Sequence, residues 1–268
     1  MTANGNAETV LHHVRRGHGP PLLLVHGLGS TWRTWEPILD DLAAGRDVLA
    51  VDLPAHGGSP STPGADTFAG LVDAVERFLR ETHLDAIDAA GVSMGARIVL
   101  DLARRGSIRA AVALNPGGFW RGWERTFFST TIGASIRVVR ALQPVMPTMT
   151  NHALGRAALL AQLSAHPARL PSDLVLQEMR SFAATSTFDA LVRDLAYGPE
   201  QTGAVSTAGP ITIGWGRKDR LCLPRQAKCA AARFPSARLH WFIDAGHYPH
   251  WDSPEETVRV ILESTGAS

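Results

Sequence analysis

A serine set symmetrically between two glycines is the feature of the sequence that most suggests chemistry. In the stretch IDAAGVSMGARIVL, Ser93 stands two residues from Gly91 and two from Gly95, where an apolar run changes into a helical pattern. A hydroxyl that projects from so tight a turn requires strained backbone, and a side chain at either glycine would clash. The spacing therefore favours an exposed nucleophile, although a helix with Ser93 as its N-cap would tolerate the same glycines.

A serine hydroxyl needs a base to remove its proton and an acid to hold that base. Asp219 stands just beyond the apolar run at 210–216, and His247 follows the run at 237–244 in a loop that contains glycine. Both positions are places where a strand would end, and the chain order Ser, Asp, His is an established one for a serine nucleophile on a sheet. We therefore predict a catalytic triad of Ser93, His247 and Asp219.

These residues need elements that bring them together. Short apolar runs alternate with amphipathic stretches, which is typical of an α/β fold with a mostly parallel central sheet flanked by helices. The apolar runs predict strands at residues 8–15, 21–27, 47–53, 86–92, 109–115, 210–216 and 237–244. Apolar residues three and four apart predict helices at residues 34–45, 67–83, 94–106, 224–234 and 254–265.

Residues 118–205 interrupt this alternation. They combine helical periodicity with proline punctuation and carry almost no strand signal. We therefore predict a helical cap or lid inserted between two strands of a core that is formed by residues 1–117 and 206–268.

Composition limits the partners that the protein can be expected to have. Of the 268 residues, 45% are hydrophobic, and 26 Lys and Arg against 25 Asp and Glu give a formal charge of +1, so nothing favours nucleic acid. Two cysteines, Cys222 and Cys229, argue against a disulfide-dependent secreted fold. The N-terminal stretch lacks a signal-peptide pattern, and no apolar run is long enough to cross a bilayer. We expect a cytoplasmic protein with a small-molecule substrate and no membrane partner, and its oligomeric state stays open.

Several short motifs occur in an informative order along the chain: VHGLGS, DLPAHGGS, GVSMGA, GRKD and GHYPHWDSPE. Together they resemble those of the α/β-hydrolase-fold serine hydrolases, over essentially the whole chain except residues 118–205. The resemblance implies an esterase-like enzyme with a lid, in which Ser93, Asp219 and His247 match the triad position by position. It implies neither a metal ion nor an organic cofactor.

The other acidic candidates fit this resemblance less well. Asp52 also follows a predicted strand, but the family uses the acid of its DLPAHGGS loop structurally. Some relatives carry the catalytic acid one strand earlier than Asp219, at the place where this chain has Asn115. We therefore favour Asp219.

The other histidines are assigned by the same comparison. Only His247 follows the Ala-Gly pair that the family places before its base, whereas His250 stands three residues later. We expect His26 to brace the loop after its strand and His56, in the AHGGS turn, to have a structural role.

Hydrolysis of an ester also needs backbone donors for the oxyanion that forms on attack. Met94 follows the nucleophile at the first turn of a predicted helix, where its N–H is free and the helix dipole adds positive potential. The resemblance implies that the second donor is the N–H of Leu28, and glycines at 27 and 29 let that backbone approach a substrate closely.

A substrate pocket is expected between the lid and the sheet. Aromatic and methionine side chains in and near the insertion suggest an apolar acyl or alcohol pocket, although any one of them could equally pack in a core. The predicted substrate-binding residues are Trp32, Phe119, Trp120, Met146 and Met149, with Trp35, Phe127 and Phe128 as further candidates.

The leading functional hypothesis is hydrolysis of a carboxylic ester, thioester or lactone of a small, largely apolar substrate through an acyl-enzyme. Carbon–carbon bond hydrolysis of a diketone-like substrate is an alternative because GVSMGA resembles the elbow of those enzymes. They usually have Asn before the nucleophile and Trp after the base, whereas this chain has Val92 and Tyr248. Dehalogenases and epoxide hydrolases use an Asp nucleophile, which Ser93 argues against. Ligand receptors and biosynthetic lyases or cyclases on the same fold also stay open.

Overall fold

A seven-stranded sheet forms the centre of the molecule, and the computed structural model describes residues 11–84 and 86–266 of the chain. The strands lie in the order β1-β3-β2-β4-β5-β6-β7. Only β1 is antiparallel to its neighbour β3, and the five other pairings are parallel. Their bounds are β1 His13–Arg16, β2 Pro21–Val25, β3 Asp47–Val51, β4 Asp88–Val92, β5 Ala111–Leu114, β6 Ile211–Gly216 and β7 Arg238–Phe242.

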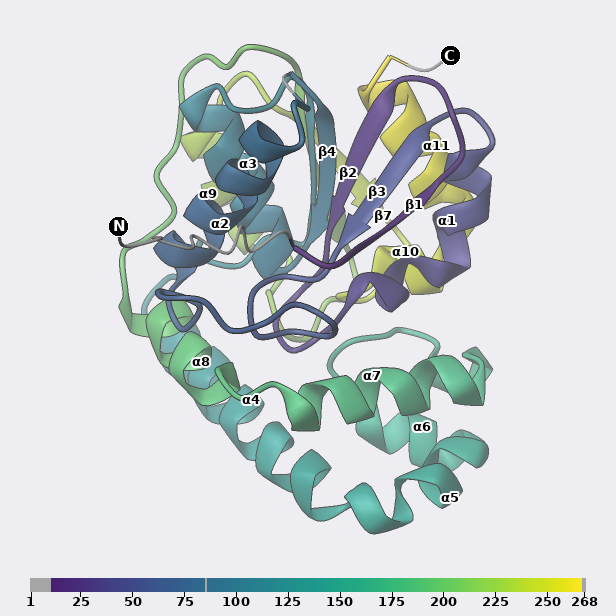
Figure 1. The fold of residues 1–268 in the computed structure, drawn as a ribbon. Coiled ribbons are helices and arrows are strands. Elements are labelled where there is room, and N and C mark those ends of the chain that lie inside the picture. Colours follow the sequence, from purple (N-terminus) through teal and green to yellow (C-terminus); the bar gives the residue numbers. More distant parts are fainter. Residues whose placement is uncertain (1–10, 85, 267–268) are drawn as a thin grey trace, which may run out of the picture.

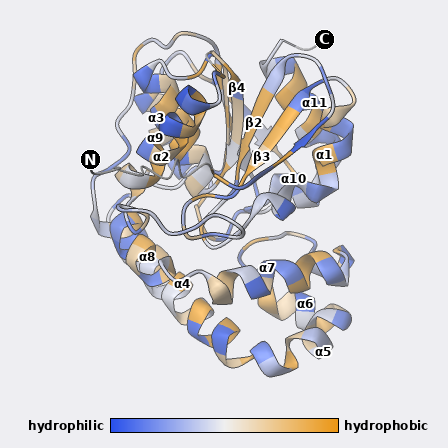
Figure 2. Ribbon diagram, viewed as in Figure 1, coloured by the Kyte–Doolittle hydropathy of each residue, from blue (hydrophilic) through white to orange (hydrophobic). Residues whose placement is uncertain are grey.

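Helices cover both faces of this sheet (Figure 1). One face carries α2 (Phe68–Glu81), α3 (Met94–Arg105) and α9 (Gln226–Arg233), and the other carries α1 (Glu36–Ala43) and α11 (Pro254–Ser264). Because both faces are covered, the central strands are apolar runs without alternation, and every residue of β4, β5 and β6 is buried. Figure 2 shows this concentration of hydrophobic residues in the strands.

The chain leaves the sheet after β5 and returns at β6 by way of a helical insertion. Its elements are α4 (Glu124–Ala141), η2 (Gln143–Val145), α5 (Met146–Asn151), α6 (Ala153–Leu159), η3 (Pro167–Arg169), α7 (Ser172–Ala184) and α8 (Phe188–Tyr197). They form a separate layer beyond one end of the strands (Figure 1). All of them lie within the range 118–205 that the sequence predicts to be helical.

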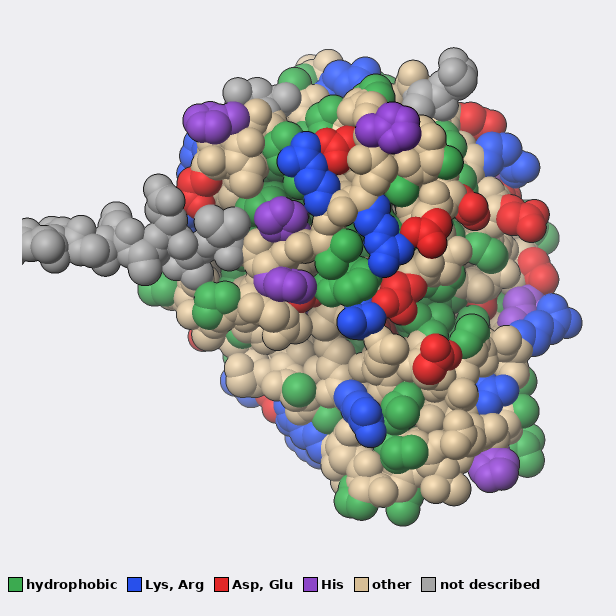
Figure 3. Space-filling model, turned by 45° about the vertical axis from the view of Figure 1, so that its right-hand side comes forward, with side chains coloured by type: hydrophobic (Ala, Val, Ile, Leu, Met, Phe, Trp, Pro, Cys, Tyr) green, Lys and Arg blue, Asp and Glu red, His purple; other side chains and the backbone are tan. Residues whose placement is uncertain are grey.

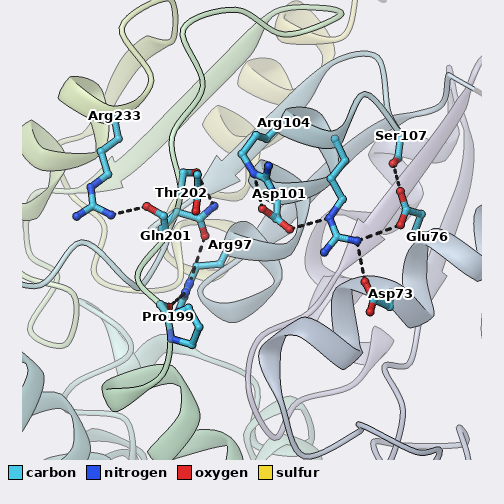
Figure 4. A network of polar contacts seen from close by, with 11 residues as sticks. Asp73, Glu76, Arg97, Asp101, Arg104, Ser107, Pro199, Gln201, Thr202 and Arg233 are labelled. Atoms are coloured by element: carbon cyan, nitrogen blue, oxygen red, sulfur yellow. Dashed lines mark hydrogen bonds and ion pairs between the residues drawn. The ribbon is translucent and has the colours of Figure 1, made fainter.

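Both ends of the insertion meet at one buried arginine of α3, Arg97. Its guanidinium donates to the backbone oxygen of Pro199 at 3.1 Å and to the side chain of Gln201 at 3.3 Å, on the returning segment (Figure 4). On the outgoing segment, a Cβ at Gly118 would lie 2.6 Å from Arg97 Nε, so this position has no room for a side chain. The guanidinium also lies over the ring of Phe68, 4.2 Å from its centroid. Arg97 thus bonds the returning stem to α3, the helix that begins after Ser93, and the outgoing stem packs against the same side chain.

The sequence predicts the element types well. All seven predicted strands exist, and the five helices predicted outside the insertion are α1, α2, α3, α9 and α11. The first strand begins at His13, later than the predicted 8–15, and residues 8–10 of that range lie outside the described residues. Two short elements are additional to the prediction, the turn η1 (Trp32–Trp35) and the helix α10 (Pro249–Asp252).

The surface charges and the helices were compared with what the sequence indicates. Basic and acidic side chains are interspersed on the face drawn in Figure 3, in line with the near-neutral formal charge. Within residues 11–84 and 86–266, no helix combines the length and the apolar character that crossing a bilayer requires.

Candidate active site

Ser93 occupies the sharp turn between β4 and α3. Its φ of 57° and ψ of −115° lie in a strained region for a residue with a side chain. A Cβ at Gly91 would lie 2.4 Å from the backbone oxygen of Gly95, and a Cβ at Gly95 would lie 2.2 Å from the backbone oxygen of Val25. Only glycine fits at either position. The Ser93 side chain makes no capping hydrogen bond to α3, so the alternative interpretation as an N-cap is not supported.

His247 and Asp219 form a buried pair at the ends of neighbouring strands. Asp219 follows β6 and His247 follows β7, and the distance between His247 Nδ1 and Asp219 Oδ2 is 2.8 Å. The other carboxylate oxygen of Asp219 accepts from the backbone N–H groups of Leu221 at 2.8 Å and Cys222 at 2.9 Å. These bonds fix the carboxylate, which in turn fixes the imidazole ring.

The pair with Asp219 uses Nδ1 of His247 and leaves the second ring nitrogen, Nε2, outside that hydrogen bond. Nε2 is buried and has no hydrogen-bond partner among the described residues. Ser93 and His247 line the same cavity. No hydrogen bond links their side chains in this structure. Hydrogen bonds of this kind are often long in unliganded sites and shorten when a substrate binds.

Asn115 is a residue of the site whose role the sequence does not reveal. It follows β5 at a φ of 49°, a left-handed conformation that Asn tolerates better than most residues. Its amide nitrogen donates to Asp219 Oδ2 at 2.5 Å and to the backbone oxygen of Gly246 at 3.0 Å, and its amide oxygen accepts from Gly216 N–H at 3.0 Å. Asn115 therefore holds the acid of β6 and the loop that carries His247 in one register.

A cysteine lies beside this pair. The side chains of Asp219, Cys222 and His247 offer ligand atoms within 4.8 Å of one another, a spacing that could hold a metal ion. However, Asp219 already accepts four hydrogen bonds from Leu221, Cys222, Asn115 and His247. Burial raises the pKa of the Cys222 thiol well above its ordinary value, so the thiolate that a metal prefers is disfavoured. An acid–base pair fits these contacts better than a metal site.

Two backbone N–H groups lie near Ser93 at the places that the sequence predicts. Met94 is the first residue of α3, and Leu28 lines the cavity. Neither N–H donates a hydrogen bond to another described residue. A Cβ on Gly27 would lie 3.3 Å from Ser93 Cβ, so the loop that carries Leu28 passes directly beside the serine.

His26 braces this loop, as expected. Its Nδ1–H donates to the backbone oxygen of Gly27 at 2.7 Å, and its Nε2 accepts from Leu53 N–H at 2.9 Å. Burial lowers the pKa of His26 to about 4, so the ring stays neutral and keeps this tautomer.

The remaining competitors also have structural partners. Asp52 accepts from the backbone N–H groups of Trp32 at 2.8 Å and Gly58 at 2.9 Å. His250 lies 3.0 Å from the Thr34 hydroxyl, and burial lowers its pKa to about 3. His56 donates to the backbone oxygen of Pro54 at 2.9 Å. None of these three lines the cavity of Ser93 among the described residues.

The cavity beside Ser93 has a volume of about 410 Å³ and lies between the sheet and the insertion. One face of α4 supplies much of its wall, with side chains that recur at helical spacing. These residues of α4 are Phe128, Thr131, Ile132, Ser135, Ile136 and Val139. Other apolar side chains come from α6, α7 and α8, namely Ala158, Leu159, Met179, Phe182, Phe188 and Leu195.

The predicted substrate-binding residues are wrong for this cavity, because among the described residues none of Trp32, Phe119, Trp120, Met146 and Met149 lines it. Phe119 and Met146 are buried in the core, and Trp120 stacks on Phe128 at 4.7 Å between ring centroids. Trp32 faces a different hollow, beside Arg33 and Asp52. Of the further candidates only Phe128 reaches the cavity, since size and apolarity alone do not separate core side chains from lining ones.

The strained serine turn, the buried His-Asp pair and the parallel sheet point to one class of protein. The chain belongs to the alpha/beta hydrolase family, whose sequence model matches residues 22–260. A pimeloyl-(acyl-carrier protein) methyl ester esterase from Aromatoleum aromaticum is 27% identical over 266 residues, which cover 90% of this chain and 96% of that one. The dihydrolipoyllysine-residue acetyltransferase component of the acetoin cleaving system of Cupriavidus necator is 30% identical over 264 residues, which cover 96% of this chain and 66% of that one.

Solved structures agree on the fold. An esterase from Thermogutta terrifontis superposes with a TM-score of 0.73 at 21% identity, over 94% of this chain and 92% of that one. The enol-lactonase from Burkholderia xenovorans has a TM-score of 0.73 at 20% identity, over 94% of this chain and 95% of that one. At these identities the likeness concerns the fold alone.

Proposed function

We propose that the protein is a serine hydrolase that cleaves a carboxylic ester, thioester or lactone of a small, largely apolar substrate through an acyl-enzyme. The observation that carries this proposal is the cavity that Ser93 and His247 line together, with the far side of the His247 ring hydrogen-bonded to Asp219 at 2.8 Å. The names of related proteins support it, since they include esterases and an enol-lactonase.

In this mechanism His247 takes the Ser93 proton on Nε2, and the serine oxygen attacks the carbonyl carbon of the ester. Asp219 holds the ring in the tautomer that leaves Nε2 free and stabilises the imidazolium that forms. His247 then gives the proton to the leaving alcohol, so the ester carbon–oxygen bond breaks and the acyl group stays on Ser93. A water molecule then gives a proton to the same nitrogen and attacks the acyl carbon. The bond between that carbon and the Ser93 oxygen breaks, and His247 returns the proton to the serine oxygen as the acid leaves.

The backbone N–H groups of Leu28 and Met94 would form the oxyanion hole. Both are free of other hydrogen bonds among the described residues, and Leu28 lines the cavity beside Ser93. The N-terminal end of α3 adds positive potential at Met94. Loss of one such donor typically costs about 3 kcal/mol of transition-state stabilisation.

The insertion would act as the lid and supply the pocket for the acyl or alcohol group. Its helices contribute most of the residues that line the cavity, and none of the described lining residues is Asp, Glu, Lys or Arg. Such a wall binds uncharged apolar groups, and it offers no ion pair to a carboxylate elsewhere on the substrate.

A fluorophosphonate probe and an ester panel test this proposal together. The wild-type protein is expected to be labelled at Ser93 and to hydrolyse p-nitrophenyl or lactone esters, whereas Ser93→Ala does neither. Carbon–carbon hydrolysis, lyase activity and simple ligand binding are the other outcomes. A wild-type protein that resists the probe and turns over no ester faster than Ser93→Ala would refute the proposal.

A further inference from the structure

One buried carboxyl group takes no part in the mechanism above. Glu178 lies in α7 of the insertion and is 3% exposed. Its Oε2 is 2.9 Å from the Ser30 hydroxyl, and its Oε1 is 3.3 Å from the Tyr248 hydroxyl. No Arg, Lys or His of the described residues forms an ion pair with it. A side chain that costs so much to bury needs a reason to be there.

The two partners of Glu178 belong to the two halves of the site. Ser30 lies on the loop that carries Leu28, and Tyr248 directly follows His247 in the chain. The Tyr248 ring stacks on the His247 ring with 5.6 Å between centroids and an interplanar angle of 27°. Its hydroxyl lies 3.7 Å from the place of a Cβ on Gly27, next to the oxyanion loop.

Further residues on the same side of α7 hold that loop. The Ser181 hydroxyl donates to the backbone oxygen of Gly29 at 2.6 Å, and the Thr185 hydroxyl approaches the same oxygen at 3.4 Å. Residues 178 and 181 are three apart and therefore share one face of the helix, and Thr185 is the residue that directly follows its last turn. Glu178 and Ser181 of α7 therefore form hydrogen bonds with Ser30 and Gly29 of the loop, and Glu178 forms a further one with Tyr248.

We propose that Glu178 is a positioning residue, which rests on the function proposed above: its carboxyl group holds the loop of Leu28 and the segment of His247 in the relative placement that ester hydrolysis requires. It touches neither substrate nor Ser93, and it acts through Ser30 and Tyr248. The insertion thereby helps to assemble the catalytic groups in addition to lining the cavity.

The protonation state of Glu178 suits this role. Burial is the main cause that raises its pKa to about 8, while the bonds from Ser30 and Tyr248 lower it in part. Near pH 7 the group is therefore a neutral acid, and its two oxygens still accept from the Ser30 and Tyr248 hydroxyls. Above about pH 8 it becomes a buried anion, which favours opening of α7 from the two loops.

The groups that surround Glu178 do not offset that charge. Tyr248 faces it directly, and burial raises the pKa of that phenol well above its ordinary value. Behind Tyr248 lie His247 and His250, and burial keeps His250 neutral. On the elements packed against α7, the turn η1 has Arg33 and α5 has no ionisable residue, while α4 has Glu124, Arg125, Arg137 and Arg140. Apart from the exposed Arg137, these pair elsewhere, with Glu36, Arg225, Glu200 and Asp189.

Steady-state kinetics against pH test the proposal. Glu178→Gln keeps the size of the side chain and one accepting oxygen, its amide can donate to the other hydroxyl, and it cannot ionise, so we expect kcat at pH 7 within about threefold of wild type and no fall of activity above pH 8. Glu178→Leu removes both hydrogen bonds and should lower kcat about tenfold at pH 7 with little change in KM. Ser30→Ala removes a bond that lowers the Glu178 pKa, so the alkaline fall should move to higher pH. Identical alkaline limbs in wild type and Glu178→Gln would overturn the proposal.

A stability measurement separates this proposal from the proposed function. Between the ordinary Glu value of 4.5 and about 8, folded Glu178 holds a proton that the unfolded chain releases, so rising pH favours unfolding. Relative to Glu178→Gln, the unfolding constant of wild type should rise about tenfold per pH unit across this window. Asp173→Asn, an exposed acid of the same helix, is the matched control and should leave the slope unchanged. Absence of ester hydrolysis by the wild type would refute the proposed function. A stability difference between wild type and Glu178→Gln that does not change with pH would separately refute the role of Glu178.

Discussion

Removing the Asn115 side chain tests quantitatively how Asp219 and the loop of His247 are held in place. Asn115→Ala removes the bonds to Asp219, Gly246 and Gly216, at distances of 2.5, 3.0 and 3.0 Å. It leaves the Gly216 N–H and the Gly246 carbonyl buried without that partner, at about 1–3 kcal/mol each, with the lower end if a water enters. Alanine at a φ of 49° adds about 1 kcal/mol of backbone strain.

The expected loss of stability is therefore about 3–7 kcal/mol, with the lower end if a water enters, which corresponds to a fall of roughly 10–20 °C in the unfolding midpoint of a chain of this size. Calorimetry or denaturant unfolding measures it, and kcat should fall because Asp219 no longer has a fixed position. Asn151→Ala, at an exposed asparagine, is the matched control and should change stability by less than about 0.5 kcal/mol. If Asn115→Ala unfolds within that margin of wild type, the clamp does not stabilise the site.

Other predictions follow from the same geometry. Ser93→Ala and His247→Ala should each reduce ester turnover to near background, and the double variant should lose nothing further, as kinetic assays of all three will show. Turnover should also fall on acidification through the range in which histidine side chains ordinarily protonate, so a flat profile from about pH 5 to 9 would contradict a histidine base. Gly95→Ala should yield little folded protein, since its Cβ would meet backbone oxygen at 2.2 Å, whereas Gly133→Ala, with open space around it, should fold normally in expression and circular dichroism tests. Ile132→Trp should narrow the cavity and reduce turnover of long-chain esters at least about tenfold more than that of acetates.

The sequence is informative where local chemistry determines the outcome. The strands are recognisable because burial on both faces requires continuous apolar runs, and the serine turn is recognisable because only glycine fits around it. Ser93, Asp219 and His247 stand at strand ends, so a parallel sheet necessarily brings them to the same edge. The structure places the three where the sequence expects them, and their catalytic roles stay a prediction.

The sequence is uninformative where a residue depends on a distant partner. Glu178 lies 148 residues from Ser30 and 70 residues from Tyr248, and nothing in the local pattern of α7 indicates a buried acid. From the sequence, Asn115 is only the position where some relatives have their acid. In the structure its amide donates to Asp219, which is 104 residues away in the chain. The prediction of cavity-lining residues was wrong for a similar reason. Phe119 and Met146 are of residue types that often line apolar pockets, but packing against distant residues buries them in the core.

The arrangement of Arg97 has a consequence for how such proteins diversify. Because Gly118 of the outgoing stem packs against the Arg97 side chain and Pro199 of the returning stem accepts a hydrogen bond from it, the residues between them form a loop whose two ends lie at the same place on α3. Such a closed loop can be exchanged as a cassette, with its length and lining altered, while the strand register beneath it is preserved. Transplanting the corresponding segment of a relative between these two points should therefore transfer its substrate preference without rebuilding the catalytic edge.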